Sequence, residues 1–430
     1  MRIIPILAFF IFTVNLFAEN NLISGYIKDY NYTDISGAMS DINWSNQKLK
    51  KDKFIYDRGG LTLQLRFNND VTKDIYFNTI LEFDYDFKIL EQEPTSLNSD
   101  GMTTYFKEGY IGIRDIGGFL DLKLGRQYIF WGKFEWGGAL DVISPWNFMT
   151  MSAEKENYRV AVDALKLDFN LFDIATLETV FLPIAPINKM ELPNQMGPLT
   201  KTIAKHSSRN ITNTEIGAKI TFEVGEDTDF SLNYFKGYDR NFSVVVDMNV
   251  ATFTPEYKKL QVMGLDFETI LFDTVWLFEL AYHHTEDEIG KDVSIKNRNI
   301  KTAFGFEKEF SNGLSISLQI SYTRLLNYNR QLEYDSLSPM LGDDIFVSRI
   351  NTYSTIYRIR YSFTPMLSFQ FLGSADLLDL NMMNLLFASW NISSQLKSYI
   401  GVINFRGASG TRFGRLEEFS RFFFELKYMF

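Results

Sequence analysis

The sequence predicts an all-β fold, an antiparallel transmembrane β-barrel of about sixteen to eighteen strands with short periplasmic turns and long outer loops. Three observations predict it. Apolar and polar residues alternate along many segments, short and long connections alternate between these segments, and the chain closes with an amphipathic stretch that ends on Phe430. Aromatic residues make up 16% of the 430 residues, yet the mean hydropathy is only -0.11. Apolar and polar side chains are therefore interleaved at short range.

The first eighteen residues are expected to be a secretory signal peptide (1–18). Arg2 supplies the basic start, residues 3–12 are apolar, and Leu16-Phe17-Ala18 offers a cleavage site. The alternative, an N-terminal membrane anchor, is disfavoured because the apolar run is shorter than the ~20 residues that a spanning helix needs. Residues 19–430 are then expected to form a single barrel, without a second domain.

Period-two alternation is clearest in two neighbouring segments. In residues 60–67, Leu61, Leu63 and Leu65 share one face, and polar side chains occupy the other. Residues 75–87 alternate in the same way, with acids on the polar face. In a membrane barrel the apolar face meets lipid and the polar face lines the lumen, whereas in a soluble sandwich the apolar face would form the core. Alternation alone does not choose between these two folds.

The connections favour the barrel. Strands are expected near 22–32, 59–68, 75–87, 105–114, 119–128, 159–168, 174–183, 214–224, 229–239, 260–271, 274–284, 300–309, 314–325, 351–363, 367–377, 383–392, 397–405 and 420–430. Short links such as 115–118 and 311–313 alternate with long ones such as 129–158 and 184–213, which is typical of outer-membrane barrels. Outside the signal, no proline lies inside an expected strand except Pro183 at a strand end.

The C-terminal strand carries a second signal. Phe424, Leu426, Tyr428 and the terminal Phe430 share one face of the last expected strand. This pattern resembles the closing strand of bacterial outer-membrane barrels, whose terminal aromatic residue is read by the barrel-assembly machinery. The resemblance implies that the chain lies in the cell outer membrane of a diderm bacterium, with outer-membrane lipid and the assembly machinery as partners.

Residues 107–148 carry the densest motif. Tyr110-Ile111-Gly112, Gly117-Gly118 and Gly125-Arg126-Gln127 resemble the two strands that precede the constriction loop in general diffusion porins. The continuation, with Trp131-Gly132 and Asp141-Val142-Ile143-Ser144-Pro145, is similar to a group of porin-like barrels, some of them found near transporters of hydrophobic compounds.

The resemblance implies that the third outer loop, residues 129–158, folds into the lumen and narrows it. Acids on such a loop face bases on the wall, and the field between them sorts solutes. The loop offers the charged candidates Lys133, Glu135, Asp141 and Glu154, together with Trp131, Trp136 and Trp146, three of the six tryptophans in the chain. The alternative is a loop that stands outward, with its tryptophans packed against neighbouring loops or at the membrane interface.

Strand parity gives candidates for the lumen wall. Charged and polar residues opposite the apolar positions are Arg66, Glu82, Asp84, Lys123 and Gln127. A lipid-facing charge at mid-depth costs roughly 2–4 kcal/mol for a base and less for an acid, so these side chains are expected to face the lumen. Arg126 falls on the apolar parity, which leaves three alternatives: the strand ends there, it bulges, or Arg126 lies at the polar rim.

The expected function is passive diffusion of small solutes through this narrowed lumen. Two alternatives stay open: a channel for hydrophobic compounds, and a plugged barrel that serves as a surface adhesin or anchor. Catalysis is not expected, because the three histidines, His206, His283 and His284, lack a nucleophile motif. No cofactor, metal or nucleic-acid partner is expected, and the net charge of -10 argues against nucleic acid. A homotrimer and a monomer are both open.

Overall fold

The computed structural model describes residues 23–34, 55–86, 102–148, 152–171, 174–184, 186–189, 195–196, 199–202, 213–247, 249–250, 252–341, 348–408 and 411–430. The signal peptide expected at residues 1–18 lies outside these ranges. No helix in the described part of the chain is both long and apolar enough to cross a membrane.

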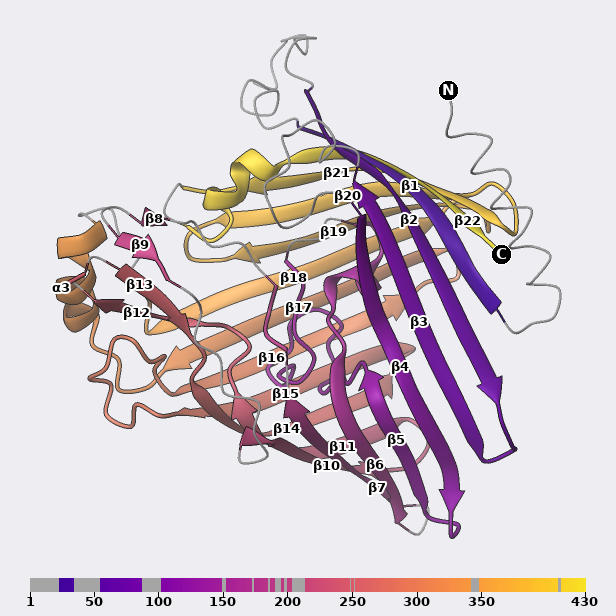
Figure 1. Cartoon of the computed structure of the whole chain (residues 1–430), viewed down its shortest axis with the longest axis horizontal. Coiled ribbons are helices and arrows are strands. Elements are labelled where there is room, and N and C mark those ends of the chain that lie inside the picture. Colours follow the sequence, from indigo (N-terminus) through magenta and orange to yellow (C-terminus); the bar gives the residue numbers. More distant parts are fainter. Residues whose placement is uncertain are drawn as a thin grey trace.

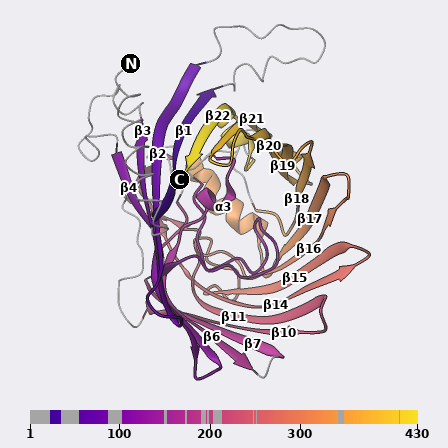
Figure 2. The ribbon, with the colours of Figure 1, turned by 90° about the vertical axis from the view of Figure 1, so that its right-hand side faces the viewer.

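Eighteen strands form one closed antiparallel barrel (Figures 1 and 2). The first strand, β1 (Ile23–Asp34), pairs with β2 (Ile55–Asp70) on one edge and with the last strand, β22 (Arg421–Met429), on the other. Between them, each wall strand pairs with the next along the chain. These strands are β3 (Ile75–Asp86), β4 (Met102–Ile116), β5 (Leu120–Gln127), β6 (Val162–Leu171), β7 (Ala175–Ile184), β10 (Glu215–Glu223), β11 (Thr228–Tyr238), β14 (Lys259–Leu271), β15 (Thr274–Thr285), β16 (Asn299–Glu309), β17 (Leu314–Leu325), β18 (Asn351–Ser362), β19 (Leu367–Asp376), β20 (Asn381–Asn391) and β21 (Leu396–Arg406).

The predicted barrel, its strand number and its alternation of short and long connections are confirmed. Short turns such as 71–74, 224–227 and 392–395 join strands at one end, and long loops such as 129–158 join them at the other. The connection 377–380 is a short exception at the long-loop end.

Elements inside the long loops were not predicted. A small sheet contains β8 (Gln195–Met196), β9 (Leu199–Lys201), β12 (Ser243–Asp247) and β13 (Thr252–Glu256). A helix, α3 (Arg330–Leu341), lies in the connection between β17 and β18. Strands of two to five residues contain too little sequence for a period-two pattern, so their pairing depends on loops that meet only in the folded barrel.

The alternating pattern sorts side chains between the two faces of the barrel. In β20, Leu386 is 54% exposed, whereas its neighbours Leu385 and Phe387 are buried. The same contrast places Leu232, Phe304 and other large apolar residues on the outside of the wall. A barrel with this outer belt suits a lipid environment, because its strands pair around a closed ring and large apolar side chains lie on its outside.

We expect Leu386→Arg to reduce the free energy of unfolding in lipid by about 2–4 kcal/mol, because the new charge would face the hydrocarbon near mid-strand. Equilibrium unfolding of the barrel in urea, in the presence of lipid vesicles, measures this. Val71→Arg is the matched control, since Val71 is also exposed (63%) but lies in the turn between β2 and β3. Equal costs for the two variants would contradict the assignment of the lipid-facing side.

Candidate functional site

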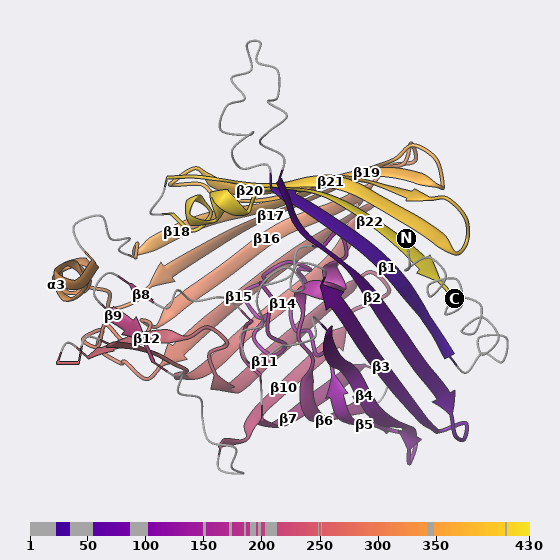
Figure 3. The ribbon, with the colours of Figure 1, turned by 45° about the horizontal axis from the view of Figure 1, so that its top comes forward.

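The described parts of the loop 129–158, residues 129–148 and 152–158, lie inside the barrel (Figures 2 and 3). They contact wall strands on different sides of the lumen. The indole N–H of Trp131 in the loop donates a hydrogen bond to Glu178 of β7 at 2.5 Å. Glu135 of the loop accepts one from Arg358 of β18 at 2.8 Å. Glu154 of the loop accepts one from Lys427 of β22 at 2.6 Å. The loop therefore crosses the lumen, as the sequence resemblance implies, and does not stand outward.

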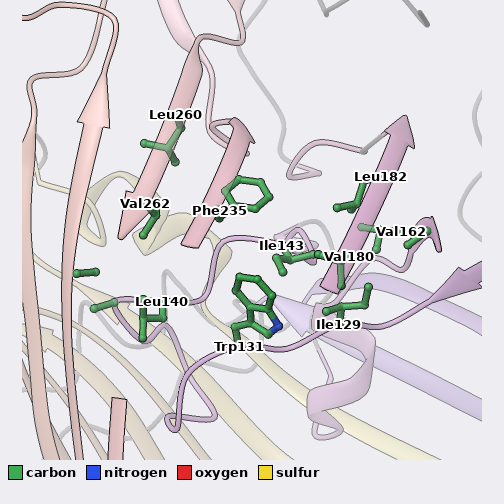
Figure 4. Close-up of a cluster of buried hydrophobic side chains, with 13 residues drawn as sticks. Ile129, Trp131, Leu140, Ile143, Val162, Val180, Leu182, Phe235, Leu260 and Val262 are labelled. Carbon is green, nitrogen blue, oxygen red and sulfur yellow. The ribbon is translucent and has the colours of Figure 1, made fainter. Parts of the chain in front are cut away.

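An apolar cluster attaches the first half of the loop to the wall (Figure 4). Its members come from the loop and from β6, β7, β11, β14 and β15: Ile129, Trp131, Ala139, Leu140, Ile143, Val162, Ala164, Val180, Leu182, Phe235, Leu260, Val262 and Ala281. Fully burying one Leu or Ile side chain stabilises by roughly 1.5–3 kcal/mol, so this contact gives the loop a defined position. Trp131 is only 3% exposed and belongs to this cluster.

A buried ion pair organises the second half of the loop. Both guanidinium N–H₂ groups of Arg159 donate to the carboxylate of Asp141, at 2.9 and 2.6 Å. The indole N–H of Trp146 donates to the same carboxylate at 3.1 Å, and the Arg159 guanidinium carbon lies 3.5 Å from the centroid of the Trp146 ring. Asp141, a predicted constriction charge, is thus buried in an internal salt bridge.

The aromatic candidates form two separate groups. Trp136 stacks on Trp146 with ring centroids 6.0 Å apart, and Trp146 stacks on Phe148 at 6.2 Å. Trp131 lies apart from them, in the apolar cluster against β7. The structure therefore brings together two of the three tryptophans that the sequence singled out.

Two more of the predicted charges bind to the wall. The ammonium of Lys133 contacts Asp229 of β11 and lies 3.5 Å from Glu268 of β14. Glu154 accepts hydrogen bonds from Lys427 and, at 3.1 Å, from the hydroxyl of Tyr399. Burial favours the protonated form of Glu154, but the nearby ammonium groups of Lys427 and Lys28 outweigh it and hold the pKa of this carboxyl below its ordinary value. Glu154 is thus ionised at neutral pH.

Glu135 is the most accessible of the four predicted loop charges. Its side chain is 36% exposed, against 13% for Lys133, 14% for Glu154 and 4% for Asp141.

Glu135 bridges Lys155 of the loop and Arg358 of the wall. Burial favours its protonated form, but these two cations outweigh that effect and lower its pKa. Arg358 also approaches Glu307 of β16 at 3.5 Å. Charges of both signs thus alternate at this edge of the loop.

The wall candidates on β2 and β3 lie on the interior face. Glu82 accepts hydrogen bonds from Tyr26 and Gln64 and pairs with Lys107 at 2.6 Å. Lys107 also donates to Asn157 of the internal loop at 2.9 Å, which places this network in the lumen.

The other two wall candidates on these strands are Asp84 and Arg66. Asp84 accepts hydrogen bonds from Tyr30 and Thr62. Arg66 is exposed and has the same strand parity as Gln64.

The wall candidates on β5 differ in their accessibility. Gln127 is 3% exposed and donates to the backbone carbonyls of Lys123, Gly125 and Ala164. The ammonium of Lys123 lies 5.8 Å from the centroid of the Tyr110 ring, on the interior side. Gln127 therefore supports the backbone where the chain turns inward, whereas Lys123 contributes charge to the wall.

Arg126 lies on the outer face, at the rim. The ladder between β5 and β6 runs without a shift through Gln127, so no bulge reverses the parity. Arg126 donates through two nitrogens to Asp163 of β6, both at 2.8 Å, and the two side chains are 36% and 44% exposed. A paired arginine at the end of the strand avoids the cost of an isolated charge at mid-depth in lipid. Of the three alternatives, the structure excludes the bulge: β5 ends one residue later, at Gln127, and Arg126 lies at the rim.

Several residues that hold the loop were missed by the sequence reasoning. They are Glu279, Arg159, Arg240, Arg358 and Lys427. Arg240 shows the reason, because it pairs with Glu215 and donates to the carbonyl of Ile143, 97 positions earlier in the chain. For the residues on strands, the alternating pattern predicts only that the side chain faces inward. It does not predict which inward-facing charge contacts the loop.

The terminal strand closes the barrel. Phe424, Leu426 and Tyr428 of β22 lie on the face opposite the buried Phe423 and Glu425. Phe430 exchanges two backbone hydrogen bonds with Gly25, each of 3.1 Å. No group of three or more His, Asp or Glu side chains within the described ranges is arranged to hold a metal ion.

No protein-family model and no curated protein sequence matches the chain. Solved structures match its fold. The outer membrane protein opdK from Pseudomonas aeruginosa has a TM-score of 0.52 and 9% identity, and the match covers 95% of this chain and 98% of that one. A BenF-like porin from Pseudomonas fluorescens Pf-5 has a TM-score of 0.50 and 8% identity, over 95% and 97% of the two chains. Pseudomonas aeruginosa OpdQ has a TM-score of 0.50 and 11% identity, with the same coverage. The chain therefore has a porin-like β-barrel fold.

We expect Arg159→Leu to destabilise the folded loop by about 3–5 kcal/mol, because it leaves the Asp141 carboxylate buried without its cation. Limited proteolysis of the folded barrel would detect this as faster cleavage within residues 129–158. The control is the double variant Asp141→Asn, Arg159→Leu, which buries no charge and is expected to be cleaved more slowly than the single variant. A single variant as resistant as the parent would contradict the structural role of this pair.

Proposed function

We propose that the chain is an outer-membrane porin through which small solutes diffuse passively, with the lumen narrowed by the loop 129–158. The single observation that carries the proposal is that this loop crosses the interior of the barrel and presents charged side chains there. In the same proposal residues 1–18 are a signal peptide, residues 19–430 form one barrel, and Phe424, Leu426, Tyr428 and Phe430 are recognised by the assembly machinery. Whether the barrels associate as trimers is part of the test.

The accessible edge of the loop is the best candidate for the passage. Glu135 and Lys155 on the loop face Arg358 and Glu307 on the wall, with side-chain exposures between 23% and 51%. Exposed ion pairs contribute about 0–1 kcal/mol, so solutes and water exchange with them at little cost. The contacts of Asp141, Glu154 and Lys133 are more deeply buried and hold the loop in place.

Two alternatives stay open. A route for hydrophobic compounds would need accessible aromatic surface: Trp131 is buried and Arg159 covers the ring of Trp146, but Phe130 and Phe148 of the same loop are 55% and 45% exposed. A plugged barrel that serves as an adhesin or anchor fits the many contacts of the loop, and conduction distinguishes it from a porin.

Single-channel recording of the purified protein in a planar bilayer tests the proposal. We expect stable ohmic steps, because the polar edge between loop and wall gives hydrated ions a path. Steps that occur in groups of three would indicate a trimer, and single steps a monomer. A folded, heat-modifiable protein without conductance would refute the porin and favour the plugged barrel.

Ion selectivity tests the passage itself. We expect Arg358→Gln to lower the ratio of anion to cation permeability by about fivefold and Glu135→Gln to raise it by a similar factor, since two charges 4 Å apart in water interact with about 1 kcal/mol. Reversal potentials across a salt gradient measure this ratio. Arg126→Gln is the matched control, because it removes the same charge from the outer face and is expected to leave the ratio unchanged. Equal shifts for Arg126→Gln and Arg358→Gln would contradict the proposed path.

A further inference from the structure

A single wall carboxylate lies at the centre of the contact between loop and barrel. Glu279 of β15 is 0% exposed. Its Oε1 accepts the backbone N–H groups of Lys133 at 2.6 Å and Phe134 at 3.1 Å, and its Oε2 accepts that of Leu140 at 3.1 Å. A buried carboxylate is costly unless hydrogen bonds compensate it, and here the loop backbone supplies them. The carboxylate and the loop therefore depend on each other.

Two glycines make this approach sterically feasible. A Cβ on Gly132 would lie 2.4 Å from Oε1 of Glu279, and a Cβ on Gly138 would lie 2.5 Å from Oε2. Gly132 also has a φ of +88°, which favours glycine. Gly137, between them, has a φ of +65°, but a Cβ there would meet no atom within 4 Å. Gly132 and Gly138, but not Gly137, thus leave the space that the Glu279 carboxylate occupies.

Neighbouring wall residues extend the same attachment. His283, four residues along β15, donates from Nε2 to the carbonyl of Ala139 at 3.0 Å. Gln319 of β17 donates to the carbonyl of Gly137 at 3.5 Å. Glu135 lies between the points held by Glu279, one residue after Phe134 and five before Leu140. The position of Glu135 therefore follows from the hydrogen bonds that Glu279 accepts.

We propose that Glu279 is the positioning residue of the constriction: its carboxylate binds the backbone of residues 133–140 and thereby fixes the place of Glu135 in the lumen. Glu279 itself is too deeply buried to meet a solute. The effect on conduction rests on the proposed porin function, whereas the attachment of the loop can be measured without any conduction.

The absence of cysteine from the chain permits a single-site reporter. Ala139→Cys places a thiol at a position that is 5% exposed in the intact structure. We expect maleimide to label this thiol about tenfold to a hundredfold faster when Glu279→Ala is added, because hydrogen bonds to a charged group are lost. Labelling at the parental rate in a barrel that passes the heat-modifiability test would overturn the proposal.

Glu425→Ala is the matched control. Glu425 of β22 is also an inward carboxylate with 0% exposure, but it binds Tyr32 and Lys28 of β1. We expect its loss to leave the labelling rate of Ala139→Cys unchanged. Equal acceleration by Glu425→Ala would overturn the proposal, since any buried acid would then have the same effect.

The glycines give a second test, made first with Glu279 present and then in the Glu279→Ala background. Gly138→Ala is expected to accelerate labelling, because its Cβ would collide with the carboxylate. In the Glu279→Ala background the same substitution should add less than about twofold, since residues in contact are not additive. Full additivity would mean that Gly138 and Glu279 act independently, against the proposal.

Single-channel recording of Glu279→Ala then distinguishes the attachment of the loop by Glu279 from the proposed porin function. Faster labelling with altered conductance supports both the positioning role and the porin. Faster labelling with unaltered conductance keeps the attachment but contradicts the role of the loop as the constriction. A silent parent protein contradicts the porin, and the labelling rates still decide whether Glu279 holds the loop.

Discussion

Closure of the sheet between β1 and β22 is the constraint on which the rest of the structure depends. The backbone of a strand in lipid must be fully paired, and a sheet achieves this only when its first and last strands meet. Here nine register pairs join Tyr26–Asp34 to Arg421–Met429, and Phe430 extends the ladder by hydrogen bonds to Gly25. Closure also fixes the two environments of the wall. Every second side chain faces outward and is apolar in most positions, and the others face an interior that must be filled or hydrated.

An eighteen-stranded barrel encloses more space than wall side chains fill, so the loop 129–158 provides much of the interior. Its contacts fall into two kinds. Apolar packing around Trp131, the Asp141–Arg159 pair and the Glu279 carboxylate is buried and fixes the loop. The ion pairs of Glu135 with Lys155 and Arg358 are partly exposed and can exchange with water and ions. This division gives a loop that is held by buried contacts and keeps charged side chains accessible at one edge.

The charges of the wall find partners on neighbouring strands and on the loop. Glu82 meets Lys107, Glu154 meets Lys427, and Lys133 lies among carboxylates of β11 and β14. On the outer face the charged pair Arg126–Asp163 lies at the rim, where both side chains are partly exposed. Burial and pairing, more than the presence of a charge, therefore decide which groups hold the structure and which stay accessible.

The sequence by itself determined the wall of the barrel. Alternation is a local property with a period of two residues, so the strands and the faces of Glu82, Asp84 and Lys123 can be predicted from short segments. The loop is different. Glu135 and Asp141 are both acids in one loop, yet one is accessible and the other is buried against Arg159. The partners that decide this come from far away in the chain: Glu279 lies 146 positions from Lys133, and Lys427 lies 273 positions from Glu154. Only closure of the barrel brings them together, because no local pattern encodes which inward side chain a crossing loop will meet.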